Sequence, residues 1–172
     1  MTKHGREGDP VAAAAALPVP PSAALRRRVL SAVDPSTRFE GFVERLALLF
    51  DLPEPRIREI LREADAGAGA AWVDAPIPGV RLCHFQGGGR VTGADCGLVH
   101  LAAGTVFPPH RHRGVEWTFV LAGSAMEDGD EVWLPGDLVI REEDSVHGFR
   151  AVGDEPYLFA VVLHGGIDVI RS

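Results

Sequence analysis

Two histidines and a glutamate lie close together in the sequence and carry side chains that bind metal ions. His110 and His112 are separated by one residue, and Glu116 follows the second histidine by four positions. Imidazole nitrogens and carboxylate oxygens are ligands of zinc, iron, manganese and nickel. Side chains at positions i and i+2 of a strand point to the same face, so both imidazoles can face one ion. The spacing therefore predicts a metal site built on strands.

A third histidine completes the predicted ligand set. The first segment runs from Gly104 through five residues to His-x-His, then three residues, Glu116, six residues and Gly123. In a second segment, Gly136 is followed after ten residues by His147. The alternative is that these side chains are buried and held by hydrogen bonds without an ion, which would cost desolvation energy that no nearby charge offsets. The predicted metal ligands are His110, His112, Glu116 and His147.

The two segments resemble the two motifs of the cupin superfamily, and the resemblance implies a jelly-roll barrel. Glu142 stands where that family usually has proline, and Asp144 stands where it usually has glycine. The spacing to His147 is intact. Either these two acids belong to a solvated turn, or one of them orients His147 from outside the ligand set.

The pattern of β-rich runs and turns after residue 72 predicts a β-barrel. Short β-rich runs alternate with turns, among them the hairpin signal Asp128-Gly129, over about one hundred residues. Many closely spaced strands favour a closed antiparallel barrel with an interior able to hold a ligand. We expect four aromatic residues in the core or the cavity lining, and two further histidines packed or on the surface. These residues are Trp117, Phe119, Trp133 and Phe159, and His84 and His100.

The preceding residues predict a two- to three-helix extension. We divide the chain into a disordered tail (1–21), a helical extension (22–70) and a cupin barrel (71–172). The first helix would follow Ser22, the second would begin at the capping-box pair Thr37 and Glu40, and the third would open at Pro55. The apolar faces of these helices either pack against the barrel or a second copy of it, or bind a partner protein.

Composition excludes several classes of function. The 172-residue chain has a net charge of −7 and a pI of about 5.4, which disfavours nucleic acid and anionic membrane surfaces. No segment approaches the roughly 18 apolar residues of a membrane span. Cys83 and Cys96 are the only cysteines and do not form a CxxC pair. They suit a reducing compartment, so we expect a cytoplasmic protein.

Residues 72–170 resemble the cupin domain of the ChrR family of anti-sigma factors. The proline-rich segment PPSAALRRRVL and the closing AVVLHGG are also similar. The resemblance implies zinc held by the four predicted ligands and a barrel that senses a signal such as an oxidant. The family's N-terminal domain binds a sigma factor through a zinc motif with a His-x3-Cys-x2-Cys pattern. This motif is absent here, because no cysteine precedes Cys83.

Two functions remain from the sequence. The first is a sensory or regulatory metal-binding cupin that acts in transcription regulation, and the second is a small cupin metalloenzyme such as a metal-dependent dioxygenase. Both imply one divalent metal ion, with zinc expected and iron, manganese or nickel as alternatives. Both also imply a small-molecule ligand or oxidant in the barrel. We further expect a homodimer, and a protein partner bound through the N-terminal helices.

Overall fold

The computed structural model describes residues 37–65, 72–127 and 131–170. These residues belong to the second of two compact units, Pro35–Ser172. The predicted tail (1–21) and the predicted helix after Ser22 lie outside the described residues. No helix in the described ranges is long and apolar enough to cross a membrane.

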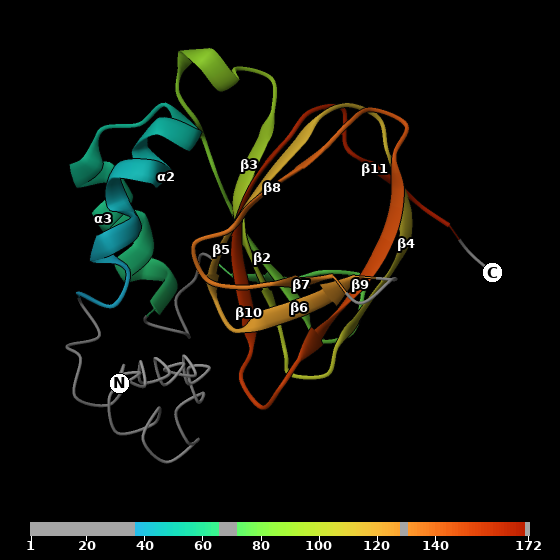
Figure 1. Cartoon of the computed structure of the whole chain (residues 1–172). Coiled ribbons are helices and arrows are strands. Elements are labelled where there is room, and N and C mark those ends of the chain that lie inside the picture. The colour runs from blue at the N-terminus through green and yellow to red at the C-terminus, as the bar shows by residue number, and fades with distance from the viewer. Residues whose placement is uncertain (1–36, 66–71, 128–130, 171–172) are drawn as a thin grey trace, which may run out of the picture. The chain divides into compact units, whose positions relative to one another are not determined.

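Eleven strands in the described residues form two antiparallel sheets arranged around a barrel (Figure 1). The first sheet has the order β1-β2-β3-β10-β5-β8, and the second has the order β11-β4-β9-β6-β7. This arrangement confirms the predicted mainly β jelly-roll barrel. The strands are β1 Val73–Asp74, β2 Val80–Phe85, β3 Asp95–Leu101, β4 Val106–His112, β5 Glu116–Ala122, β6 Ser124–Glu127, β7 Val132–Trp133, β8 Leu138–Arg141, β9 Val146–Val152, β10 Tyr157–Leu163 and β11 Ile167–Val169.

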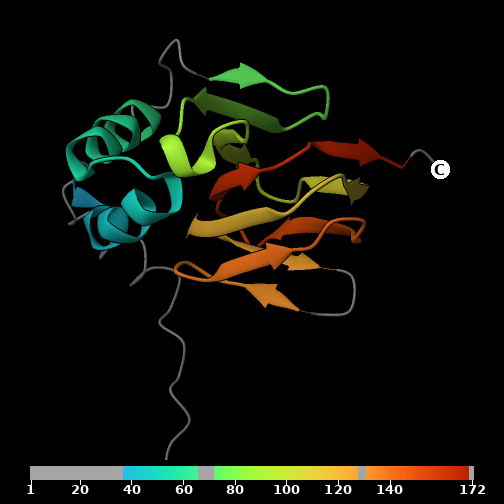
Figure 2. The same ribbon diagram turned by 90° about the horizontal axis from the view of Figure 1, so that it is seen from above.

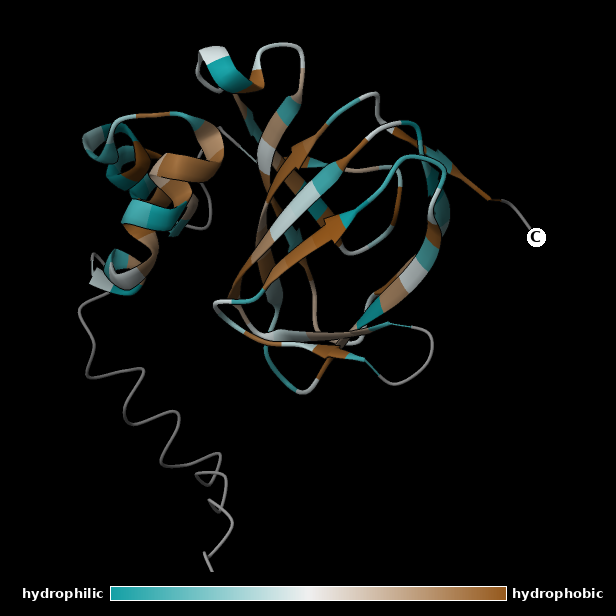
Figure 3. Cartoon of the chain, turned by 45° about the horizontal axis from the view of Figure 1, so that its top comes forward, coloured by the Kyte–Doolittle hydropathy of each residue, from teal (hydrophilic) through white to brown (hydrophobic). Residues whose placement is uncertain are grey.

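Alternation along β5 separates the barrel interior from an outer apolar face. Thr118 and Val120 are buried on the inner side, where Val120 belongs to the apolar cluster of the barrel interior. Phe119 and Leu121 belong to a separate apolar cluster on the outside of the first sheet. Successive side chains of a strand point to opposite faces, which accounts for this division. Hydropathy accordingly changes from residue to residue along the strands (Figure 3).

Two helices cover the outer face of the first sheet. A 3-10 turn, η2 (Glu40–Phe42), leads into α2 (Val43–Phe50), and α3 (Glu54–Asp65) follows. Both helices lie on one side of the barrel (Figure 2). The ring of Phe42 packs edge-on against that of Phe119 at 5.3 Å, and Arg45 donates a hydrogen bond to the carbonyl of Gly136 at 2.8 Å. The expected apolar helix face is therefore buried against the barrel itself.

The first of these helices begins later than the capping-box pair Thr37 and Glu40 predicts. The residues at the two cap positions, Phe39 and Phe42, make no side-chain capping hydrogen bond. The carboxylate of Glu40 instead accepts hydrogen bonds from Arg58 of α3, the shortest at 2.7 Å. The predicted helix start was wrong, because the turn begins at Glu40 with Phe39 at its cap position.

Candidate metal site

Strand β4 presents the first two predicted ligands to the barrel interior. His110 and His112 lie on the same face of the strand, and only 2% and 0% of their surfaces are exposed. The pairing of β4 with β9 shifts register between Phe107 and His110, at the two prolines of the strand. Proline cannot donate a ladder hydrogen bond, so an irregularity is expected there. The i, i+2 spacing thus places both imidazoles as the sequence predicts.

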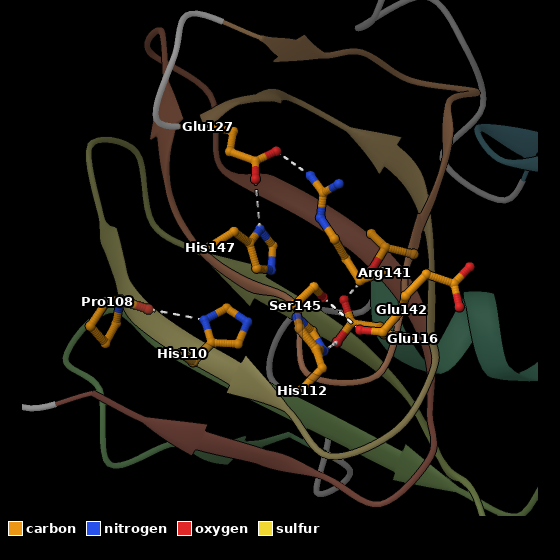
Figure 4. A network of polar contacts seen from close by, with 10 residues as sticks. Pro108, His110, His112, Glu116, Glu127, Arg141, Glu142, Ser145 and His147 are labelled. Carbon is orange, nitrogen blue, oxygen red and sulfur yellow. Dashed lines mark hydrogen bonds and ion pairs between the residues drawn. The ribbon is translucent and has the colours of Figure 1, made fainter.

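Strand β9 brings the third histidine to the same point. His147 is the register partner of His110 in the pairing of β4 with β9, and it is buried. The centroids of these two rings are 4.5 Å apart. One potential ligand atom from each of His110, His112 and His147 lies within 4.8 Å of the others. The structure therefore brings three of the four predicted ligands together, from two neighbouring strands (Figure 4).

Glu116 lies beside this cluster, but its carboxylate is not among the ligand atoms that lie within 4.8 Å of one another. It is the first residue of β5, in the facing sheet. Its Oε2 is 3.8 Å from Nδ1 of His112, and its Oε1 accepts a hydrogen bond from the hydroxyl of Thr118 at 2.8 Å. Only 13% of its side chain is exposed. Its role as the fourth ligand stays a prediction, which its burial and its contact with His112 favour.

Burial holds the three imidazoles in the neutral form that binds metals. Desolvation lowers the pKa of His110. It also lowers the pKa of His112 to about 4 and that of His147 to about 3, where repulsion between protonated rings of the cluster and the positive charge of Arg141 add to the shift. Desolvation also raises the pKa of Glu116, although the Thr118 hydroxyl opposes this shift. Metal ligands must be deprotonated, so the neutral imidazoles are ready to bind, whereas the buried carboxylate needs a cation beside it.

The hydrogen bonds of the cluster leave several ring nitrogens available. Nδ1 of His110 donates to the carbonyl of Pro108 at 3.0 Å, which leaves its Nε2 with a free lone pair. Both nitrogens of His112 and both nitrogens of His147 are buried and have no hydrogen-bond partner among the described residues. Buried polar atoms are rarely left unpaired in this way. A divalent metal ion fits this donor set, because it would satisfy several of them at once.

Two charged residues at the site carry no signal in the sequence motifs. The carboxylate of Glu127 forms an ion pair with Arg141, and its Oε1 is 3.3 Å from Nδ1 of His147. The guanidinium of Arg141 lies over the ring of Trp133 at 5.3 Å. Both charged side chains are largely buried, at 14% and 21% exposed. In the sequence Arg141 directly follows the apolar run LVI, and in the structure it is the register partner of Glu116.

These contacts bear on the two acids that depart from the cupin pattern. Asp144 is exposed, adopts a positive φ of 64°, and lies 3.6 Å from Arg111. The side chain of Glu142 is also exposed, and its backbone carbonyl accepts the hydroxyl of Ser145 at 2.6 Å. A solvated turn describes both acids. The carboxylate that contacts His147 belongs to Glu127.

A cavity of about 280 Å³ reaches the metal-ligand cluster from the barrel interior. His110 and Glu116 line it together with mainly apolar side chains, among them Phe159. Two further polar residues line it, His84 and Asp95, and Nδ1 of His84 is 2.8 Å from the Asp95 carboxylate. Pockets for small molecules are typically apolar with a few placed polar groups. A small ligand in this cavity would touch the candidate metal site.

The fold and the site together define a class of protein. Two facing antiparallel sheets that enclose a cluster of buried histidines from adjacent strands make a cupin barrel with a candidate metal centre. The particular family follows from the sequence. A family model described as the ChrR Cupin-like domain matches residues 65–166. The chain therefore belongs to the ChrR cupin-like family.

Known proteins with similar sequence or structure include enzymes and a regulator. An oxalate decarboxylase of Arthroderma benhamiae is 32% identical over 80 residues, which cover 42% of this chain and 19% of that enzyme. The chain thus spans about a fifth of the length of this relative. Two solved structures, each under 25% identical, show the shared fold.

The first is an acetylacetone dioxygenase from Acinetobacter johnsonii, with 16% identity and a TM-score of 0.51 over 59% of this chain and 73% of that chain. The second is Rhodobacter sphaeroides SigE in complex with the anti-sigma ChrR. It has 23% identity and a TM-score of 0.53 over 86% of this chain and 69% of the matched chain.

Proposed function

We propose that the chain is a metal-binding sensory or regulatory cupin, in which one divalent ion is held by His110, His112, Glu116 and His147. Zinc is the expected ion, with iron, manganese or nickel as alternatives. The observation that carries the proposal is the convergence of three buried imidazoles within 4.8 Å in a member of the ChrR cupin-like family. Bound zinc would act as a Lewis acid that holds an oxygen atom of a ligand.

The residues of the chain suggest how a signal would enter the barrel. The mainly apolar cavity admits a small molecule or oxidant, and His110 and Glu116 lie in its lining. These two side chains belong to different sheets, since His110 is on β4 and Glu116 is on β5. A ligand that changes how they are held would therefore act on both sheets.

The helices provide a route by which such a change would reach a partner protein. Glu116 begins β5, and Phe119 on the outer side of the same strand contacts Phe42. Leu48 of α2 is 65% exposed on the side of the helix away from the barrel core. The fold similarity to a SigE–ChrR complex supports a protein partner in transcription regulation. We do not expect the isolated chain to hold a sigma factor tightly, because it lacks cysteines before Cys83.

Two further features of the regulator are proposed. Cys83 and Cys96 are both buried and unpaired, which supports a reducing, cytoplasmic location. A homodimer is also expected, and light scattering on the purified chain tests it.

A small cupin metalloenzyme, such as a metal-dependent dioxygenase, is the second candidate function. The cavity beside the site favours it, because a substrate there would lie against the ion. The pair His84 and Asp95 in the cavity lining adds an imidazole oriented by a carboxylate, an arrangement suited to proton transfer. The fold similarity to an acetylacetone dioxygenase is in keeping with this alternative.

Elemental analysis of protein from the native host, combined with oxygen uptake on acetylacetone and related diketones, separates the two functions. Zinc without oxygen consumption supports the regulator, whereas iron with oxygen consumption supports the enzyme. The variant His110→Ala serves as the control, since it should lose both the metal and any uptake. Protein that binds none of the four metals would overturn both proposals.

A further inference from the structure

Glu127 occupies a position from which it can act on a metal ligand without belonging to the ligand set. It is the last residue of β6, and its carboxylate lies between His147 and Arg141 (Figure 4). Its Oε1 is 3.3 Å from Nδ1 of His147, within ion-pair distance but without a hydrogen bond between the two atoms, and its other oxygen accepts a hydrogen bond from Arg141. The group of ligand atoms that lie within 4.8 Å of one another does not include this carboxylate.

A carboxylate beside one ring nitrogen of a neutral imidazole favours the tautomer that carries the proton on that nitrogen. A neutral imidazole has one N–H, and the partner of that N–H selects the tautomer. An acceptor beside Nδ1 of His147 favours the proton there and leaves the lone pair on Nε2 free for a metal. His110 shows a full hydrogen bond at the same ring position, since its Nδ1 donates to the carbonyl of Pro108, whereas Nδ1 of His147 has only the 3.3 Å contact with Glu127. Such outer partners commonly orient metal-binding histidines.

We infer that Glu127 is a positioning residue for the metal site, which holds His147 as the Nδ1–H tautomer and directs its Nε2 toward the ion. This inference rests on the proposed metal-binding function. Arg141 secures Glu127 in turn, because it pairs with the carboxylate while its guanidinium lies over the ring of Trp133. A carboxylate that is only 14% exposed needs such a partner to remain charged.

The competing explanation is that Glu127 and Arg141 only tie β6 to β8 across the barrel. A tie of that kind would depend equally on both partners and would leave the tautomer of His147 unaffected. In a positioning role the carboxylate acts directly on His147, and Arg141 contributes only indirectly by holding the carboxylate in place. The two explanations therefore differ in a spectroscopic signature and in the relative effects of the two substitutions.

The first measurement uses metal-free protein, so it does not depend on whether the chain binds a metal. Imidazole ¹⁵N shifts report which ring nitrogen is protonated. The wild type should show His147 protonated on Nδ1, and Glu127→Leu should lose this preference. The matched control Glu131→Leu changes an exposed residue of the same hairpin and should leave the spectrum unchanged. A wild-type His147 protonated on Nε2, or an unchanged tautomer in Glu127→Leu, would overturn the inference.

The second measurement is zinc affinity by competition with a chromogenic chelator. Loss of the carboxylate in Glu127→Leu should weaken zinc binding about 10- to 100-fold. Glu127→Gln keeps the shape and one acceptor, and should give an intermediate loss of zinc affinity. This variant replaces Glu127→Leu if the leucine variant fails to fold. Arg141→Met should lose clearly less, because removal of its positive charge favours a nearby cation. Equal losses in Glu127→Leu and Arg141→Met would support a simple tie and contradict the inference, whereas a wild type that binds no zinc would refute the proposed function instead.

Discussion

Acidification of the metal-free protein tests how strongly burial acts on the histidine cluster. The pKa of His112 is lowered to about 4 and that of His147 to about 3, from an ordinary value of 6.5. In the unfolded chain both imidazoles regain the ordinary pKa, so below pH 6.5 the unfolded state binds protons that the folded state does not. Stability is therefore fully present above pH 6.5 and is lost as the pH falls toward the lowered values.

The size of the effect follows from this difference in proton binding. When the pH falls from 7.5 to 5.5, an imidazole that stays neutral in the folded state and becomes protonated in the unfolded state lowers the free energy of unfolding by about 1.3 kcal/mol. His112 and His147 together would lower it by about 2.6 kcal/mol. Glu116 acts in the opposite direction, because burial raises its pKa and the folded state therefore binds a proton more readily than the unfolded state does.

Urea denaturation at the two pH values, in the presence of a chelator, measures this change. The variant His112→Gln removes one imidazole and keeps Glu116 in both proteins. The wild type should lose about 1.3 kcal/mol more than the variant between pH 7.5 and 5.5. Equal losses would refute the reasoning, because they would mean that His112 carries the same charge in the folded and unfolded states.

Two further substitutions test the packing and the predicted fourth ligand. Leu46 and Leu48 lie on the same helix and are 1% and 65% exposed. In urea denaturation, Leu46→Ala should lower the free energy of unfolding by about 2–5 kcal/mol. Leu48→Ala should lower it by less than about 0.5 kcal/mol. Similar costs for both would contradict the packing of α2 on the barrel. Glu116→Gln should weaken zinc binding by more than about tenfold in chelator competition, while the exposed control Glu142→Gln should not change it; unchanged affinity in Glu116→Gln would exclude it as a ligand.

The local patterns of the sequence predict those parts of the site that depend on one strand or on motif spacing. The i, i+2 separation of His110 and His112 fixes their common face, because the period of a strand is two residues. The position of His147 followed from its distance to Gly136. That His147 lies opposite His110 depends on the register of β4 with β9, which the spacing alone does not determine. The resemblance to a known family supplied this step.

The sequence did not indicate the residues that surround the ligands. Glu127 and Arg141 lie 14 positions apart on different strands, and only the folded barrel brings their charges together. The hydrogen bonds between Glu40 and Arg58 likewise join residues 18 positions apart on different elements. Contacts between elements bring both pairs together, and local spacing carries no information about them.

The metal content of the purified chain tests the central claim most directly. Wild-type protein should carry about one divalent ion per chain, because His110, His112 and His147 offer neutral nitrogens that converge on one point. His147→Ala should lose most of this metal, while His84→Ala, a histidine outside the cluster, should keep it. Elemental analysis that finds full metal retention in His147→Ala, or no metal in the wild type after incubation with zinc, would contradict the account.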